Sequence, residues 1–205
     1  MLEALIIFCK APRPGFVKTR LAASLGPQIA CQCYETLAET VCRQLQGMER
    51  VELRFTPDDA RGEISRWKKR PSWRTEPQGP GDLGDRLSRT FDSCFAAGVE
   101  RVVVIGTDTP ELGEADIREA FLALGDVDLV LGPSEDGGYW LIGLAEPHPE
   151  LFENQEWGTD RVCQETLFRA QVRGLQSRLL RVLPDIDTEE DWNRFRDRQG
   201  SKRTR

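Results

Sequence analysis

The order of hydrophobic and polar residues predicts strands that alternate with helices along the chain. Two continuously apolar runs, at residues 4–9 and 101–106, are typical of strands buried on both faces of a parallel sheet. Between such runs, apolar residues recur every three or four positions, which is the spacing of an amphipathic helix. The alternation predicts βαβ units and an α/β fold with three layers, α/β/α, around a mostly parallel sheet.

The expected elements follow directly from these patterns. We expect strands at 4–9, 51–55, 101–106, 129–131, 139–144 and 179–183, and helices at 27–46, 60–67, 83–95, 117–124, 159–172 and from 188 onward. A stretch rich in proline and glycine, 71–81, is expected to be a loop. No repeat or linker divides the chain, so residues 1–197 are expected to form one domain. The polar, basic tail 198–205 is expected to be disordered.

Composition narrows the classes of function. The chain has 205 residues and a net charge of −6, which argues against a general nucleic-acid-binding protein. Its six cysteines form no CxxC pair, so buried free thiols are expected. No run reaches the ~18 apolar residues of a membrane span, and the start of the chain lacks the features of a secretion signal. These features predict a reduced, cytoplasmic protein without a membrane span.

The segment APRPGFVKTRL follows the first predicted strand and gathers cations around a glycine. Ligands of parallel sheets bind beyond the carboxyl ends of the strands, which is where this segment would lie. Gly15 allows close approach of a ligand, and Arg13, Lys18 and Arg20 offer charged donors to a phosphate. A Walker A loop is excluded because Val17, not glycine, precedes the lysine. A basic surface turn without function is the alternative.

Acidic residues follow two other predicted strands. Asp108 comes directly after the run VVVIG, and Asp185 and Asp187 follow the last strand. Such carboxylates suit Mg²⁺ or Mn²⁺, since these ions take one or two carboxylates together with phosphate oxygens and water. Asp108 alone is equally compatible with a cap or turn, and Thr188 with the acidic residues after it is explained by helix capping.

The turn SEDGG interrupts two further apolar runs, at residues 134–138. Asp-Gly-Gly between strands is compatible with a simple hairpin turn. In the functional interpretation, the glycines leave room for a ligand and Asp136 supplies a polar contact or a base. Together, the basic loop, the aspartates and this turn predict a site for phosphate and metal on one rim of the sheet.

Five segments in this order resemble a known family: KAPRPGFVKTRL, GTDTPEL, GPSEDGGYWLIGL, WGTDR and DIDTEEDW. The chain resembles uncharacterised bacterial glycosyltransferase-A-like proteins of the nucleotide-diphospho-sugar transferase superfamily. That family is similar to 2-phospho-L-lactate guanylyltransferase and to molybdenum-cofactor nucleotidyltransferases. The resemblance extends over residues 4–195 and implies the glycosyltransferase-A fold.

The resemblance also implies roles for individual residues. The loop after the first strand would bind the nucleotide and its phosphates through Lys10, Arg13, Gly15, Lys18 and Arg20, with Lys18 also catalytic. Asp108 and Asp187 would bind the cofactor, Mg²⁺ or Mn²⁺. The acceptor side would comprise Asp136, Gly137, Gly138 and Tyr139, with Asp136 as the candidate base.

The implied reaction is metal-dependent transfer of a glycosyl group from a nucleotide sugar to a small acceptor. Two departures leave nucleotidyl transfer from an NTP to a phosphorylated acceptor open. Thr-Asp-Thr stands at 107–109 where glycosyltransferases of this fold usually have Asp-x-Asp, and the first loop is poorer in glycine than in nucleotidyltransferases. A nucleotide-binding module without turnover is the third possibility. The sequence gives no indication of the oligomeric state.

Overall fold

A sheet of seven strands, in the order β3-β2-β1-β4-β6-β5-β7, forms the centre of the part of the chain that the structure describes. The computed structural model describes residues 2–203. The strands are β1 (Glu3–Lys10), β2 (Val51–Thr56), β3 (Arg74–Pro77), β4 (Arg101–Ile105), β5 (Leu129–Pro133), β6 (Tyr139–Leu144) and β7 (Ser177–Leu179). Only β6 runs antiparallel to its neighbours, β4 and β5, within this sheet. The predicted mostly parallel sheet is therefore confirmed.

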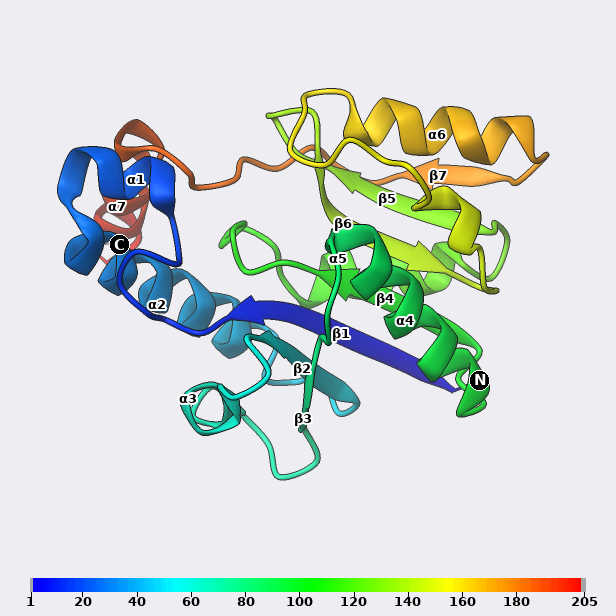
Figure 1. The fold of residues 1–205 in the computed structure, drawn as a ribbon, viewed down its shortest axis with the longest axis horizontal. Coiled ribbons are helices and arrows are strands. Elements are labelled where there is room, and N and C mark those ends of the chain that lie inside the picture. The colour runs from blue at the N-terminus through cyan, green and yellow to red at the C-terminus, as the bar shows by residue number, and fades with distance from the viewer. Residues whose placement is uncertain (1, 204–205) are drawn as a thin grey trace.

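Helices cover both faces of the sheet, as the three-layer prediction requires (Figure 1). On one face lie α2 (Pro27–Gln44), α3 (Arg61–Ser65) and α5 (Glu114–Ala123). On the other lie α4 (Leu83–Ala96) and α6 (Val162–Val172), with the short 3-10 helix η1 (Pro149–Leu151) beside α6. The helices α1 (Thr19–Leu25) and α7 (Glu189–Arg203) pack near the start of α2, beyond the carboxyl end of β1 (Figure 1).

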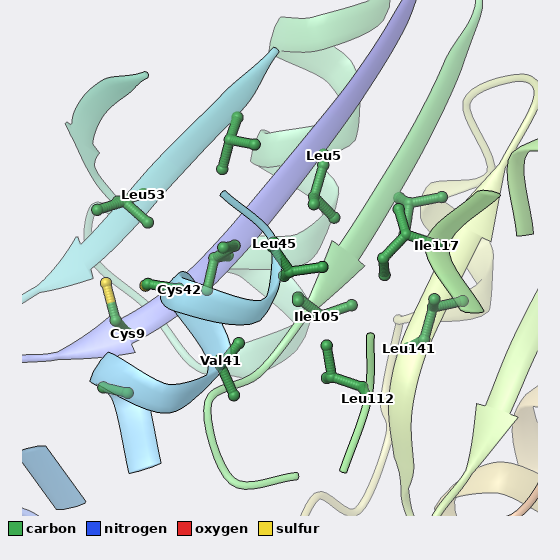
Figure 2. Close-up of a cluster of buried hydrophobic side chains, with 14 of the residues drawn as sticks. Leu5, Cys9, Val41, Cys42, Leu45, Leu53, Ile105, Leu112, Ile117 and Leu141 are labelled. Carbon is green, nitrogen blue, oxygen red and sulfur yellow. The ribbon is translucent and has the colours of Figure 1, made fainter. Parts of the chain in front are cut away.

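Alternating side chains of β1 explain why both faces need cover. Leu5 and Cys9 point to the face of α2, where they meet Val41 and Leu45 (Figure 2), whereas Ile6 joins the cluster under α4 and α6. A fully buried side chain of this kind contributes about 1.5–3 kcal/mol relative to an exposed one. The six cysteines are all buried free thiols, as predicted.

The chain reverses its direction of travel across the sheet between β1 and β4. From β1 it moves outward to β2 and β3, and it then returns to place β4 on the other side of β1. In open α/β sheets, the carboxyl ends of two strands separated in this way form a crevice, because their connections leave toward opposite sides. The topology alone therefore points to the ends of β1 and β4 as the place for a ligand.

Several local predictions are corrected by the structure. The expected loop 71–81 contains β3, because Trp73 and Thr75 are buried and the segment pairs with β2. The last strand lies at Ser177–Leu179 rather than 179–183, and Leu183 makes only an isolated bridge to Ser134. The helix α1 was not expected.

The end of the chain is more ordered than its composition suggests. Residues 198–203, expected to be disordered, continue α7, since each residue added to a formed helix gains a hydrogen bond for a small entropic cost. Residues 204 and 205 of that expected tail lie outside the described residues. Among the described residues, no helix has the length and apolarity that crossing a membrane demands.

Candidate functional site

A cavity of about 560 Å³ opens at the carboxyl ends of β1 and β4, where the topology places a crevice. Its volume lies in the range of small-molecule sites. Phe8, Leu87, Val104 and Ile142 give it an apolar wall. The polar and charged groups that line it come from the loop after β1, the end of β4, the turn before α4 and the segment before α7: Lys10, Lys18, Thr19, Arg20, Gln78, Arg86, Thr107, Asp108 and Asp187.

Lys18 lies between the two predicted metal-binding aspartates. Its Nζ is 2.7 Å from Oδ1 of Asp108 and 2.8 Å from Oδ1 of Asp187. The lysine side chain is only 4% exposed, whereas those of Asp108 and Asp187 are 51% and 33% exposed. Burial by itself lowers the pKa of Lys18, but the two carboxylates outweigh it and the pKa is raised. The lysine therefore stays charged, and the three side chains together carry one net negative charge.

The backbone of the first loop directs Lys18 into this position. Lys18 has φ 49°, the left-handed conformation that non-glycine residues rarely adopt, and α1 begins directly after it. Val17 before it is buried at 1% exposure. This anchoring fixes the turn, and such a local cost of about 1–3 kcal/mol is typical of functional sites.

Asp187 reaches Asp108 because the last segment crosses the end of β4. The backbone N–H of Ile186 donates to the carbonyl oxygen of Asp108 at 2.9 Å, and Ile186 packs with Leu37 and Phe195. Thr188 caps α7 as predicted, since its Oγ1 accepts from the N–H of Asp191. The start of α7 is thereby fixed directly behind Asp187.

Tyr34, which the sequence did not single out, joins the two strand ends. Its hydroxyl accepts from the backbone N–H of Lys10 at 2.7 Å and from Oγ1 of Thr107 at 3.2 Å. Burial raises the pKa of Tyr34 well above its usual value, so it stays protonated. Lys10 is the last residue of β1 and Thr107 follows β4, so this hydroxyl holds the floor of the cavity together.

Two residues of the predicted phosphate loop lie away from the cavity. Arg13 binds Glu63 at 2.6 Å and Asp59 at 3.0 Å, and these carboxylates raise the pKa of its guanidinium. Gly15 adopts φ 86° at the tip of the loop, and a Cβ added there would meet no atom within 4 Å other than those of its chain neighbours. Of the five predicted cation-loop residues, Lys10, Lys18 and Arg20 line the cavity, and Arg20 lies 3.6 Å from Asp187.

The SEDGG turn is a hairpin turn between β5 and β6. Asp136 accepts from the N–H of Gly138 at 2.9 Å and is exposed. Gly137 has φ 88°, and a Cβ there would lie 2.0 Å from the carbonyl oxygen of Asp160, so only glycine fits. Of the predicted acceptor residues, Tyr139 lines the cavity, whereas Asp136, Gly137 and Gly138 do not.

Three further residues belong to the site or its edge, although the sequence patterns did not point to them as site residues. Gln78 and Arg86 line the cavity from the turn after β3 and from α4. Asp185, considered only as a strand-end carboxylate, is half-buried; burial and the charges of Asp136 and Asp187 raise its pKa to about 6. The glycine-rich turn before an amphipathic helix was the only signal for Gln78.

A family model described as "Uncharacterized protein conserved in bacteria (DUF2064)" matches residues 38–159, which is more than half of the chain. The search of curated proteins returned no match.

Solved structures with the same fold are numerous, and one of them is substantially similar in sequence. A candidate nucleotide-diphospho-sugar transferase from Desulfovibrio desulfuricans G20 is 29% identical, with a TM-score of 0.84 over 91% of this chain and 82% of that one. A nucleotidyl transferase from Methanothermobacter thermautotrophicus is 15% identical, with a TM-score of 0.62 over 96% and 97% of the two chains. The synthetase of CMP-2-keto-3-deoxy-manno-octonic acid, in complex with CTP, is 8% identical, with a TM-score of 0.61 over 98% and 100%. The last two show the fold alone, which is that of nucleotide-diphospho-sugar transferases.

Proposed function

The chain belongs to the DUF2064 family, and on that premise we propose that it is a metal-dependent transferase that moves a glycosyl group from a nucleotide sugar to a small acceptor. The observation that carries the proposal is the Lys18 ammonium between Asp108 and Asp187 at a cavity of about 560 Å³. The similar structure from Desulfovibrio desulfuricans, whose name gives nucleotide-diphospho-sugar transfer, supports the class of reaction.

The donor set of the site fits Mg²⁺ or Mn²⁺. Asp108 and Asp187 each place a carboxylate at the cavity, and both are partly exposed. No group of three or more His, Cys, Asp or Glu side chains among residues 2–203 could hold a metal ion. Two carboxylates suffice where the substrate's phosphates and water complete the shell, as is usual for Mg²⁺. The proposed cation is therefore one that binds together with the nucleotide.

The residues of the site suit departure of a nucleoside diphosphate. In the proposed step, an acceptor hydroxyl oxygen bonds to the anomeric carbon while the bond to the diphosphate breaks and its electron pair leaves with the phosphate. Lys18 and Arg20 would hold that developing charge in a fixed position, and a bound divalent cation would neutralise it further. The acceptor proton passes to a base, for which Asp136, exposed on the turn before the cavity residue Tyr139, stays our candidate.

Nucleotidyl transfer is the second candidate, and one observation favours it. The carboxylates that line the cavity are Asp108 and Asp187, and Lys18 binds both, so within the described residues no separate base faces the ligand. Attack by a phosphorylated acceptor on the α-phosphorus of an NTP needs no base, because the attacking phosphate is already ionised. Guanylyl transfer would be one such reaction.

The six buried free thiols suit a reducing compartment such as the cytoplasm for either reaction.

Thermal unfolding with a panel of nucleotide sugars and NTPs, each with and without Mg²⁺ or Mn²⁺, tests the proposal. A ligand at one hundred times its Kd stabilises the fold by about 2.7 kcal/mol, a shift in Tm of roughly 5–10 °C for a chain of this size. Each ligand that stabilises the protein is then tested as a substrate, and the released product is identified. Nucleoside diphosphate identifies glycosyl transfer, and pyrophosphate identifies nucleotidyl transfer.

The variant Asp108→Asn tests the proposed metal site, and Asp59→Asn is its matched control. We expect Asp108→Asn to abolish the metal-dependent part of the shift, while Asp59→Asn, in the ion pair of Arg13 outside the cavity, keeps it. Equal shifts in wild type and Asp108→Asn would remove Asp108 from the metal site. No shift with any nucleotide would mean that this chain has the fold without the proposed function.

A further inference from the structure

The cavity contains a further cation, Arg86, whose charge is not balanced by an acidic partner. Arg86 stands on the first turns of α4 and lines the cavity. Among the ion pairs of residues 2–203, none involves Arg86, whereas Lys18 contacts two carboxylates. The nearby acids Asp82 and Asp85 cap α4 by accepting each other's backbone N–H. The positive charge therefore faces the cavity largely uncompensated.

The guanidinium of Arg86 also keeps a hydrogen-bond donor unused. Its Nε is buried and has no partner among the described residues. A buried donor without a partner destabilises the folded state, so such an atom needs an explanation. Helix stability does not explain the position of Arg86, since the amino-terminal end of a helix favours anions and disfavours an arginine. A ligand that accepts a hydrogen bond from the guanidinium would explain it.

Gln78 holds the guanidinium in place. Its Oε1 accepts from Nη1 of Arg86 at 3.3 Å, while its Nε2 donates to the carbonyl oxygens of Cys9 and Arg54 at 3.2 and 2.9 Å. Gln78 is 4% exposed, so this anchor is rigid. With Nη1 bound to Gln78, neither Nε nor Nη2 has a hydrogen-bond partner among the described residues. Together these two nitrogens match two oxygens of one phosphate or carboxylate, which would reach the buried Nε once the side chain turns that edge toward the cavity.

From these contacts we propose that Arg86 binds an oxyanion of the ligand, a phosphate or a carboxylate, as a charged anchor in addition to Lys18 and Arg20. The proposal rests on the proposed transferase function for the identity of the ligand, but not for the existence of the anion site. The oxyanion belongs either to the nucleotide or to an anionic acceptor, and the chemistry at Arg86 is the same in both cases.

Binding of inorganic pyrophosphate to the full chain, measured by titration calorimetry without metal, is the first test. We expect Arg86→Gln to weaken it at least about tenfold, and Arg86→Lys, which keeps the charge but not the planar fork, to fall between the two. Arg89→Gln is the matched control: Arg89 lies on the same helix and donates to the carbonyl oxygens of Gln78 and Pro80, but it does not line the cavity. It should lower Tm and leave the affinity unchanged.

The results separate this proposal from the loss of structure and from the proposed function. Wild-type affinity in Arg86→Gln, or an equal loss in Arg89→Gln, would overturn the proposal. Repeating the titration with a nucleoside triphosphate and with a sugar phosphate shows which oxyanion Arg86 holds, because Arg86→Gln weakens the binding of the ligand that carries this oxyanion. If both keep wild-type affinity in the variant, the proposal is wrong. If pyrophosphate depends on Arg86 but no nucleotide binds, the anion site stands and the transferase function falls.

Discussion

Two cations of the first loop each lie between two carboxylates, but only one of them faces a cavity. Lys18 contacts Asp108 and Asp187, and Arg13 contacts Asp59 and Glu63. The lysine side chain is 4% exposed and that of the arginine is 34% exposed. Each of these two cations therefore pairs with two carboxylates, but the environments differ, although the cations are only a few residues apart in the sequence.

The origin of the partners explains the difference. Asp59 and Glu63 belong to one short segment around α3, so Arg13 forms a surface clamp to a single segment. Asp108 and Asp187 lie in different segments, and Asp187 is 169 residues away from Lys18 in the sequence. Three separate segments therefore have to meet to assemble the group around Lys18. Surface ion pairs contribute little to stability, whereas removing one partner from a buried group costs much more. The contrast predicts that replacing Lys18 and replacing Arg13 have different effects on stability and on ligand binding.

The largest effect is expected for Lys18→Met. Loss of the ammonium leaves Asp108 and Asp187 close together with only the exposed Arg20, 3.6 Å from Asp187, as a counter-charge, and we expect the free energy of unfolding at pH 7 to fall by about 1–3 kcal/mol. This value is below that of fully buried pairs because both carboxylates are partly exposed. Urea unfolding in the presence of a chelator measures it, and Lys10→Met, which removes an exposed cavity lysine, is the control.

Addition of Mg²⁺ sharpens this prediction. If Asp108 and Asp187 bind the metal, Mg²⁺ should stabilise Lys18→Met more than wild type, because the ammonium no longer competes for the same oxygens. A measurable stabilisation by Mg²⁺ that is equal in both proteins would contradict the assignment of the two aspartates to a metal.

The sheet and its main helices were predictable because burial leaves a periodic trace in the sequence. The continuous run VVVIG reflects contacts on both faces of the sheet. The four-residue spacing of Leu37, Val41 and Leu45 reflects contacts on one face of a helix. The strand β3 left no such trace, since it has four residues, of which Arg74 and Glu76 are exposed. A short edge segment is defined by pairing with its neighbour, and pairing is not visible in a local pattern.

The site was predictable where it depends on strand ends and not where it depends on packing. Lys18, Asp108 and Asp187 follow strands, so the topology rule brought them to one edge. No such rule separates Arg13 from Lys18, because which cation turns inward depends on the left-handed backbone of Lys18. Arg86 occupies a polar position of an amphipathic helix, and its role depends on the buried amide of Gln78 across the turn.

A smaller effect, with a pH dependence, is expected for Asp185→Asn. The pKa of Asp185 is raised to about 6 by burial and by Asp136 and Asp187, against an ordinary value of about 3.9 when unfolded. The folded state thus holds this proton more tightly, and ionisation destabilises it as the pH rises from about 4 to about 6. Above that range the variant should be more stable than wild type by about 1–2 kcal/mol, reduced for partial solvent screening.

Urea unfolding with a chelator at pH 4 and pH 8 checks this prediction. At pH 4 the carboxyl is protonated in the folded state and about half protonated in the unfolded state, so most of the gain should disappear. A gain of equal size at both values would mean that the asparagine acts through packing and not through charge. The exposed Asp160, replaced by asparagine, is the control.

The smallest effect is expected for Arg13→Met, the counterpart of Lys18→Met on the other clamp. Its carboxylate partners are exposed, so their charges are screened by water, and Tm should change by no more than about 2 °C. Ligand-dependent stabilisation, measured with the nucleotide panel, should stay at the wild-type level because Arg13 does not line the cavity. A loss of ligand binding as large as that of Lys18→Met would show that the loop acts as one unit, with Arg13 released from Asp59 and Glu63 when the nucleotide binds, as the sequence pattern predicts.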